Sequence, residues 1–455
     1  MTPFRIGAGA GFAGDRIDPA QALAEHGRLH ALVFECLAER TIALAQLRRL
    51  CDADQGYDLL LQDRMRAVLP ACIAQGVTVI SNMGAAHPRA AGLAVLEVAR
   101  ELGLRGLRVA VVTGDDVLDW VRSHDVDLID GVGRASDLGE RLISANAYLG
   151  ADALLPALES KAQVIITGRV ADPALFLAPL MHHFGWRADD WTRLGRGVLV
   201  GHLLECAAQV SGGYIADPGQ FDVPALHDIG FPLAEVAADG TAVISKLPGT
   251  GGRIDRLTCT AQLLYEIEDP ARYLQPDVVA DFSQVQLQEL GEQGVRISQG
   301  GGHERPSHLK ATLAYRDGFI GEGQISYAGP GAVARAELAL QVLQHRLDRL
   351  ESLGQLERFQ HSGRPERRAE LIGVNAMHGA ALGGDRSPYE VRVRLAVRCS
   401  TRAQAQRVCQ EVEALYLNGP AAGGGVTQSV REVVATASAL VPRSAVRVVT
   451  EMLES

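Results

Sequence analysis

Two adjacent carboxylates, Asp115 and Asp116, follow an apolar run and the pair Thr113 and Gly114. Bringing two like charges together costs free energy unless something uses their charge. Such a pair can bind a divalent cation, act as a general base or contact substrate hydroxyls. One of the two could instead cap the following helix. We take Asp115 and Asp116 as candidate catalytic or metal-binding residues, with Thr113 and Gly114 as ligand contacts.

An arginine stands at the end of another apolar run, in the sequence Thr167-Gly168-Arg169. A guanidinium at this position suits a carboxylate or phosphate of a ligand, so Arg169 is a candidate catalytic residue. A structural salt bridge is the alternative. Asp172 precedes Pro173 and has the pattern of a helix N-cap, and it is also a candidate ligand contact.

His202, Glu205 and Cys206 share one face of the helix expected over residues 201–206. An imidazole oriented by a carboxylate can transfer protons, so His202 and Glu205 are candidate catalytic residues. The second histidine of a zinc-binding HExxH motif is absent. The alternative is a histidine that simply fills the core.

Residues 9–14 match the GxGxxG dinucleotide fingerprint and follow a strand-like run. Charged residues come before any helix can begin, which weakens the match, although Glu35 stands where the acid of a Rossmann fold would. The pattern does not favour NAD or flavin; a loop for a small molecule or phosphate, or a tight turn, fits better. The candidate ligand contacts here are Gly9, Gly11, Asp15, Arg16 and Glu35.

Two further loops supply candidate ligand contacts. Asn82 and Gly84 follow the apolar run at residues 77–80. Residues 246–252 are rich in glycine, and their backbone amides could form an anion nest to which Lys246 adds charge. This loop lacks Walker spacing, so a surface turn is the alternative. The candidate contacts in it are Lys246, Thr250 and Gly251.

The elements that must position these residues alternate between strand and helix over the first part of the chain. Such alternation predicts an α/β fold with a mostly parallel sheet flanked by helices. Loops at the carboxyl ends of parallel strands leave one edge, so the candidate residues should converge on one crevice. The expected strands are residues 4–6, 31–34, 77–80, 107–112 and 164–166, and the expected helices are residues 19–26, 38–50, 57–75, 88–102 and 136–149.

The pattern changes after residue 219. Closely spaced strand-like segments predict an α+β antiparallel section over 220–353, with a hairpin turn at Arg316-Asp317-Gly318 and a helix over 331–353. A polar linker at 354–366 leads to a tail with strands and a helix, which suggests a small ferredoxin-like domain. We therefore expect three parts: a parallel-sheet domain at 1–219, the α+β section at 220–353 and the tail domain at 367–455.

Composition narrows the class of protein. The chain has 455 residues, 47% of them hydrophobic, and a net charge of -10 without a basic run, which argues against nucleic-acid or anionic-membrane binding. Seven cysteines lack metal-binding spacing, and neither a leader nor a long apolar run is evident. We expect a cytoplasmic homo-oligomer that acts on a small molecule, with no nucleic-acid or membrane partner.

Taken together, these segments resemble the acyclic terpene utilisation family, and the tail resembles the ferredoxin-fold domain that accompanies it. Ala85 and His87 depart from the family pattern in the loop after Asn82, and Ala261 stands where the family has an acid. The segments that carry the resemblance are 11–12 with 14–16, 112–116, 167–169 with 172, 201–206, 211–214 with 217–219, and 249–252 with 264–266.

The resemblance implies a role in degrading geraniol-like or citronellol-like compounds through acyl-CoA intermediates. From it we expect a catabolic enzyme of the hydratase or lyase type that transfers protons next to the carbonyl of a branched acid or acyl-CoA. Two alternatives stay open: a dinucleotide-dependent oxidoreductase, and a non-catalytic assembly subunit of an acyl-CoA processing complex. The cofactor is not identified; a divalent cation at Asp115 and Asp116 is a candidate.

Overall fold

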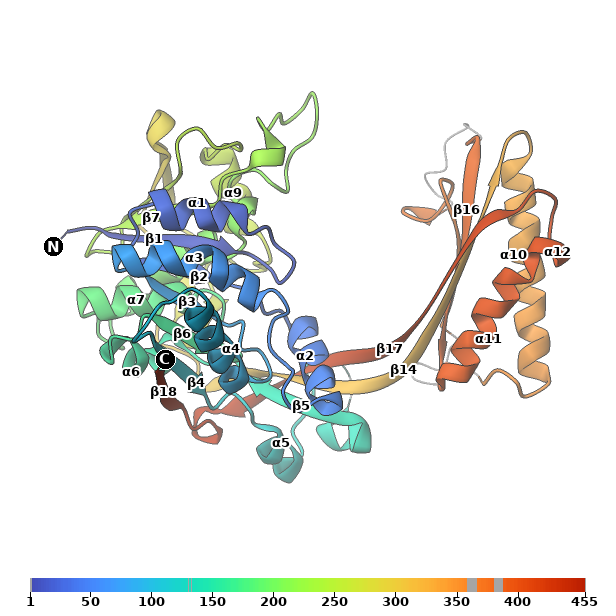
Figure 1. Ribbon diagram of the computed structural model, residues 1–455, viewed down its shortest axis with the longest axis horizontal. Coiled ribbons are helices and arrows are strands. Elements are labelled where there is room, and N and C mark those ends of the chain that lie inside the picture. Colours follow the sequence, from blue (N-terminus) through green and yellow to red (C-terminus); the bar gives the residue numbers. More distant parts are fainter. Residues whose placement is uncertain (1, 130, 132, 358–365, 380–387, 455) are drawn as a thin grey trace. The chain divides into compact units, whose positions relative to one another are not determined.

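The structure, a computed structural model, describes residues 2–454 except 130, 132, 358–365 and 380–387. The chain divides into two compact units, Met1–Ala314 with Thr436–Ser455, and Tyr315–Ala435. The long strands β14 (His308–Ala328) and β17 (Gly424–Pro442) each contribute residues to both units (Figure 1). The first unit therefore holds the described residues near both ends of the chain.

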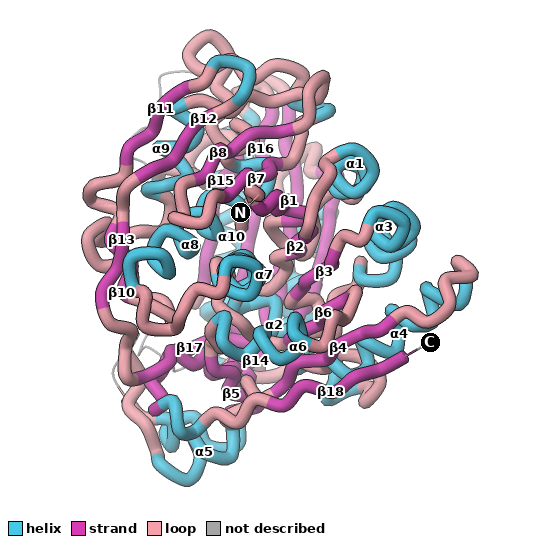
Figure 2. The backbone as a smooth tube through the Cα atoms, turned by 90° about the vertical axis from the view of Figure 1, so that its left-hand side faces the viewer, coloured by secondary structure: helices cyan, strands magenta, loops and turns pink. Residues whose placement is uncertain are grey.

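A ten-stranded sheet, counted over the described residues, forms the centre of the first unit in the order β11-β12-β8-β7-β1-β2-β3-β6-β4-β18 (Figure 2). The run from β1 to β4 in this order is parallel, and antiparallel strands flank it on both sides. Strands β2 and β6 are buried along their whole length, as expected for apolar runs covered on both faces. The predicted α/β class is confirmed, with a sheet that is parallel at its centre. The parallel strands are β1 Phe4–Ala10, β2 Ala31–Phe34, β3 Thr78–Ser81, β6 Val164–Thr167 and β4 Arg108–Thr113.

Helices cover both faces of this sheet (Figure 2): α1, α3 and α4 lie on one face, and α6, α7 and α8 on the other. Helix α7 is apolar on nearly all sides because it packs between the sheet and α8. Gly76 ends α3 with φ 70°, a left-handed conformation that glycine adopts without strain. The helices of this unit are α1 Asp18–His26, α2 Glu39–Cys51, α3 Leu61–Gln75, α4 Pro88–Glu101, α5 Leu118–His124, α6 Leu155–Glu159, α7 Ala174–Phe184, α8 Trp191–Leu204 and α9 Arg256–Leu264.

Antiparallel strands complete the first unit. Strands β7 (Pro232–Val236), β8 (Ala242–Lys246), β12 (Val295–Ser298) and β11 (Gln286–Glu289) extend the sheet from β1. At the other end β18 (Val449–Glu454) pairs with β4, so the end of the chain returns to the central sheet. A separate small sheet contains β9 (Tyr273–Leu274), β10 (Val279–Asp281) and β13 (Gly301–His303).

The second unit has the strand and helix order of a ferredoxin-like fold. It runs from β14 through α10 (Ala332–Ser352), β15 (Arg367–Ile372), β16 (Glu390–Cys399) and α11 (Arg402–Glu413) to β17, with the short α12 (Leu415–Asn418) after α11. The sheet order is β15-β16-β14-β17. This βαββαβ arrangement begins at Tyr315 rather than at residue 367, because α10 and the second half of β14 belong to the same core. Part of the expected linker, 358–365, lies outside the described residues.

Two sequence-based expectations were wrong. Arg316-Asp317-Gly318 does not reverse the chain; Gly318 has φ 79° inside the continuous strand β14. Residues 136–149 do not form a helix but a 3₁₀ segment, Ala135–Arg141, followed by strand β5 (Leu142–Ala147), which pairs with β14. In both cases tertiary strand pairing overrides a local preference. Further 3₁₀ segments are Ala151–Leu154, Ala207–Gln209, Leu226–Asp228, Gly291–Gln293 and Arg443–Ala445.

Candidate functional site

Asp115 is buried just beyond the carboxyl end of β4. Its Oδ2 accepts hydrogen bonds from the backbone N–H of Arg169, at 3.0 Å, and from Asn146 Nδ2, at 2.8 Å. A Cβ at Gly168 would lie 2.6 Å from Asp115 Oδ1, so the glycine allows the two loops to meet. Burial raises the pKa of Asp115 to about 6. This carboxyl group is therefore close to the pKa that suits a general base near neutral pH.

The neighbouring Asp116 has a different environment. Its side chain is exposed, and its Oδ1 accepts from the backbone N–H of Leu118 at 3.1 Å, at the start of α5. Gly114 lies with φ 120° against Arg447, and Thr113 Oγ1 is 3.5 Å from the Val449 carbonyl oxygen. Among the described residues, no three His, Cys, Asp or Glu side chains are grouped to hold a metal ion. The two aspartates thus separate into one buried carboxylate and one exposed carboxylate that accepts from the first amide of α5.

Arg169 is buried, and its guanidinium bonds to the protein itself. Nε and Nη2 donate to the Val170 carbonyl oxygen at 3.1 and 2.7 Å, Nη1 donates to the Leu37 carbonyl oxygen, and Nη2 pairs with Asp172. The guanidinium carbon lies 4.3 Å from the centre of the Tyr148 ring. The salt bridge with Asp172 is the structural alternative named above, so Arg169 supplies fixed positive charge and joins two loops.

Glu35 and Asn82 connect the ends of β2 and β3. Asn82 Nδ2 donates to Glu35 Oε1 at 2.9 Å, and Asn82 Oδ1 accepts from the backbone N–H of Cys36 at 2.8 Å. Burial raises the pKa of Glu35, an effect that the charge of Arg169 opposes and that of Glu205 reinforces. In the same loop, a Cβ at Gly84 would lie 2.8 Å from Pro88 Cα. The pKa of Glu35 therefore depends both on Arg169 at the sheet edge and on Glu205 at the end of α8.

His202 and Glu205 lie at the end of α8, and both are buried. His202 Nδ1 lies 3.0 Å from Glu205 Oε1, which leaves Nε2 of His202 and Oε2 of Glu205 buried and without a hydrogen-bond partner among the described residues. The Tyr273 ring packs edge-on against the imidazole, with centres 5.4 Å apart. Burial raises the pKa of the next residue, Cys206, to about 12, so its thiol stays protonated.

We call Glu35, Asn82, Asp115, Arg169, His202 and Glu205 the carboxyl-edge cluster. All six side chains are buried. Hydrogen bonds join Asp115 to the backbone of Arg169, Asn82 to Glu35, and His202 to Glu205, and the charges of Arg169 and Glu205 act on Glu35. The cluster brings carboxyl, imidazole and guanidinium groups together at the carboxyl edge of the parallel strands, where α/β proteins bind ligands.

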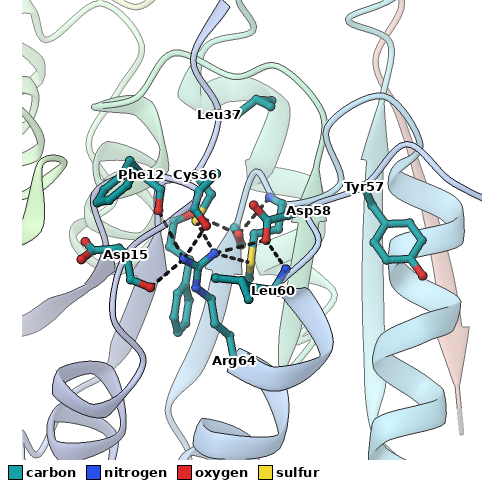
Figure 3. A network of polar contacts seen from close by, with 12 residues as sticks. Phe12, Asp15, Cys36, Leu37, Tyr57, Asp58, Leu60 and Arg64 are labelled. Carbon is teal, nitrogen blue, oxygen red and sulfur yellow. Dashed lines mark hydrogen bonds and ion pairs between the residues drawn. The ribbon is translucent and has the colours of Figure 1, made fainter. Parts of the chain in front are cut away.

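The glycine-containing loop after β1, residues 11–15, is hydrogen-bonded to Arg64 of α3, whose side chain is fully buried (Figure 3). Its Nη2 donates to the carbonyl oxygens of Phe12, Ala13 and Asp15 at 3.3, 3.0 and 3.3 Å. Its Nη1 reaches Asp58 Oδ1 at 3.3 Å and Cys36 Sγ at 3.1 Å. Arg64 thereby ties the loop after β1 to the loop after β2.

The first amide of this loop is already paired. Asp15 Oδ2 accepts from the backbone N–H of Gly11 at 2.9 Å, and burial raises the pKa of Asp15. A carboxylate here occupies the position where a dinucleotide loop would bind pyrophosphate. Gly9 packs on the ring of Phe34, and Arg16 donates to the carbonyl oxygen of His227 at 2.7 Å. This geometry gives no support to a dinucleotide site.

Gly11→Ala should destabilise the protein by about 1–3 kcal/mol, because the new Cβ would lie 2.7 Å from Cys206 Cα and force the loop away from α8. Urea denaturation measures the change in free energy of unfolding. Gly14→Ala is the matched control, since its Cβ would meet only the movable ring of Phe12. Equal effects of the two substitutions would contradict a close approach specific to Gly11.

The predicted contacts after β8 form a separate group. Lys246 Nζ donates to Thr250 O at 2.6 Å and lies 3.3 Å from Thr250 Oγ1, while Gly251 packs against Ala225. Burial lowers the pKa of Lys246. A cavity of about 420 Å³ lies beside Lys246, Gly249 and Arg253. Within the described structure, no hydrogen bond or ion pair joins this group to the carboxyl-edge cluster.

Sequence reasoning missed several residues that complete the cluster's surroundings. Tyr148 donates to Glu39 Oε1 at 2.5 Å and lies against Arg169, and Asn146 bridges Asp115 and Gln46. Asn146 lies in β5 and Tyr148 directly follows it, in a segment that the sequence pattern assigned to a helix. The buried polar residues Ser144 and Asn146 alternate along that segment, and this period of two was the available signal for a strand.

The fold and the carboxyl-edge cluster define an α/β protein with buried acid, base and cationic groups at the carboxyl ends of parallel strands. The chain belongs to the acyclic terpene utilisation family: the family model described as acyclic terpene utilisation family protein AtuA matches residues 4–452, and so spans both units. Membership implies a role in acyclic terpene utilisation. Searches of curated proteins and of solved structures found no significant match. None of the helices in the described ranges combines the length and apolar character needed to cross a bilayer.

Proposed function

We propose that this protein is a catabolic enzyme of acyclic terpene or branched-acid degradation. It acts on an acid or its CoA thioester by moving a proton at the carbon next to the carbonyl, as hydratases and lyases do. Family membership supports the pathway class. The chemistry of the carboxyl-edge cluster supports the type of reaction.

The observation that carries this proposal is the His202–Glu205 pair. Glu205 accepts or shares the Nδ1 proton, which orients the ring, and Nε2 on the far side is buried without a partner in the described structure. Buried polar atoms are normally paired, so the unpaired imidazole nitrogen and the unpaired carboxylate oxygen of this pair suggest positions that a ligand completes. An oriented imidazole with one free nitrogen is the arrangement that proton transfer requires.

Asp115 and Arg169 have different roles in this reaction. Asp115, with its pKa of about 6, serves as the base that removes a proton at neutral pH. The fixed positive charge of Arg169 favours the negative charge that develops on the substrate oxygen. Asp116 is exposed and accepts from the Leu118 amide, so it has no part in this scheme.

Hydrogen exchange into D2O tests the proposal without knowledge of the final product. The protein is incubated in D2O with the CoA thioester of a citronellol-derived acid, and in parallel with the free acid. Mass spectrometry then measures deuterium at the carbon next to the carbonyl. We expect exchange above the rate without protein, and a loss of about 10²-fold or more in His202→Asn, which keeps a donor toward Glu205 but removes Nε2.

His124→Asn is the matched control, because His124 is an exposed histidine that stacks on Trp120. Its exchange rate should equal that of the unmodified protein. An absence of exchange with both the thioester and the free acid would reject proton transfer next to a carbonyl. Exchange that His202→Asn leaves unchanged would remove the His202–Glu205 pair from the scheme.

A further inference from the structure

A second cavity lies at the opposite edge of the central sheet. Its volume is about 360 Å³, and it is lined by residues at the amino ends of β1, β2, β3 and β6, with others from the ends of α3, α6 and α7. The carboxyl-edge cluster contributes no residue to it. The lining residues include four exposed basic side chains, His30, Lys161, His182 and His183.

His30 has a defined tautomer. The backbone N–H of Arg5 donates to its Nδ1 at 2.9 Å, so this nitrogen carries no proton. Burial and the neighbouring His183 lower the pKa of His30, which favours the neutral ring. The proton then resides on Nε2, and His30 offers an N–H donor rather than a lone pair for a metal ion.

A histidine ring both donates and accepts hydrogen bonds, so Lys161 is the charged donor among these four side chains. Neither Lys161 Nζ nor the rings of His182 and His183 make a hydrogen bond or ion pair with any described residue, and no Asp or Glu is among the residues that line the cavity. The histidines are not needed to cap α7, because the backbone N–H groups of Gly185 and Trp186 both donate to the Met181 carbonyl oxygen. An ammonium group in a cavity wall without a carboxylate favours an anionic ligand.

The rest of the cavity wall is apolar and aromatic. Phe4 stacks on His30 with ring centres 4.9 Å apart and lies equally close to His183. Apolar side chains from α3, α6 and α7, and from the segments that follow α3 and α6, continue this wall: Ile73, Val77, Leu158, Ala162 and Pro179. A volume of this size fits a small molecule, and a mixed wall requires a charged end and a hydrocarbon part in the same ligand.

We propose that this amino-edge cavity binds a small aliphatic carboxylate, with its carboxylate at Lys161 and the Nε2–H of His30 and its hydrocarbon chain against Phe4 and the apolar wall. The site is distinct from the carboxyl-edge cluster and does not depend on the proposed reaction. The cavity lies at the amino ends of the strands whose carboxyl ends carry that cluster. A ligand bound in the cavity would therefore contact the same strands at their opposite ends.

Isothermal titration of the full-length protein with hexanoate tests this site. We expect saturable binding of hexanoate, and a dissociation constant raised at least about fivefold by Lys161→Met and by His30→Asn, since each removes one charge-assisted or neutral hydrogen bond. Asparagine at 30 keeps an acceptor for the Arg5 amide while the Nε2 donor is lost. Arg100→Met, which removes an exposed charge on α4, should leave the constant unchanged.

Two ligand controls separate the parts of the proposal. 1-Hexanol has the same chain without charge, and inorganic phosphate has charge without the chain; both should bind at least about tenfold more weakly than hexanoate. Phosphate binding as tight as that of hexanoate would overturn the proposal of a carboxylate with an apolar body. Hexanoate binding that neither variant weakens would overturn the site itself.

Hydrogen–deuterium exchange of the unmodified protein provides a measurement that does not depend on variants that fold. Saturating hexanoate should slow amide exchange in residues 72–78 and 161–163, the segments that contribute lining residues to the cavity. Unchanged exchange in both segments at saturation would overturn the proposal, whatever the variants show.

Discussion

Asp115→Asn should lower the rate of deuterium exchange into the substrate by about 10²- to 10⁴-fold, the range that a general base contributes. Asparagine cannot take up a proton at neutral pH. Its side-chain oxygen can still accept from the Arg169 amide and from Asn146, because both donors meet the same oxygen of Asp115. The variant should therefore fold, and its exchange rate measured in D2O reports on the base.

The pH profile gives a second test of the same residue. A base with a pKa of about 6 is protonated and inactive below that pH, so the exchange rate should rise with pH through about 6 and level off above it. Asp115→Asn should lose this acid limb. A limb near pH 6 that persists in the variant would assign it to another group.

The free energy of unfolding should also depend on the titration of Asp115, but it should fall with rising pH where the exchange rate rises. The folded-state pKa of Asp115 is raised above the unfolded value of 3.8, so the unfolded chain loses the proton first and stability falls as pH rises from about 4 to about 6. A difference of about two pKa units corresponds to about 3 kcal/mol. Urea denaturation at pH 4, 5, 6 and 7 should show this decline in the unmodified protein and a flatter profile in Asp115→Asn.

Asp116→Asn is the matched control for these experiments, because it removes the same charge from the adjacent residue. Asp116 is exposed, and an asparagine oxygen can also accept from the Leu118 amide, so exchange and stability should change little. Equal losses of exchange from the two variants would indicate that net charge, rather than a base at Asp115, controls the rate.

Arg64→Met should destabilise the protein by about 3–5 kcal/mol, the cost of breaking a buried ion pair from one side. The change removes donors from three carbonyl oxygens of the glycine-containing loop after β1 and leaves the carboxylate of Asp58 buried without its partner. Urea denaturation measures the loss. Arg66→Met on the exposed face of the same helix should cost less than about 1 kcal/mol.

A double substitution separates the two causes of this loss. Adding Asp58→Asn to Arg64→Met removes the uncompensated charge, so part of the stability should return. The part that does not return measures the loop contacts with the carbonyl oxygens of Phe12, Ala13 and Asp15. A loss from Arg64→Met no larger than that from Arg66→Met would contradict the structural role of the buried guanidinium.

Local pattern was enough to predict most of the first unit. The runs ending near Ala10, Phe34, Ser81, Thr113 and Thr167 are β-branched and apolar because both faces of the strand are covered, and the structure has strands there. The rule that parallel strands share a carboxyl edge then predicted which distant loops would come near one another. The βαββαβ order of the second unit was less visible, since β14 and β17 each serve two units.

By itself, the sequence determined the strand ends and the residue types that follow them, because hydrophobic period and turn chemistry are local properties. Only the tertiary structure decided which of two adjacent aspartates is buried. Asp115 and Asp116 are the same residue type in the same loop, and the segments that pack on them differ. The same holds for Arg64, a helical arginine that sequence would place in water. Burial and pairing depend on the other segments that surround a side chain, and those segments lie far away along the chain.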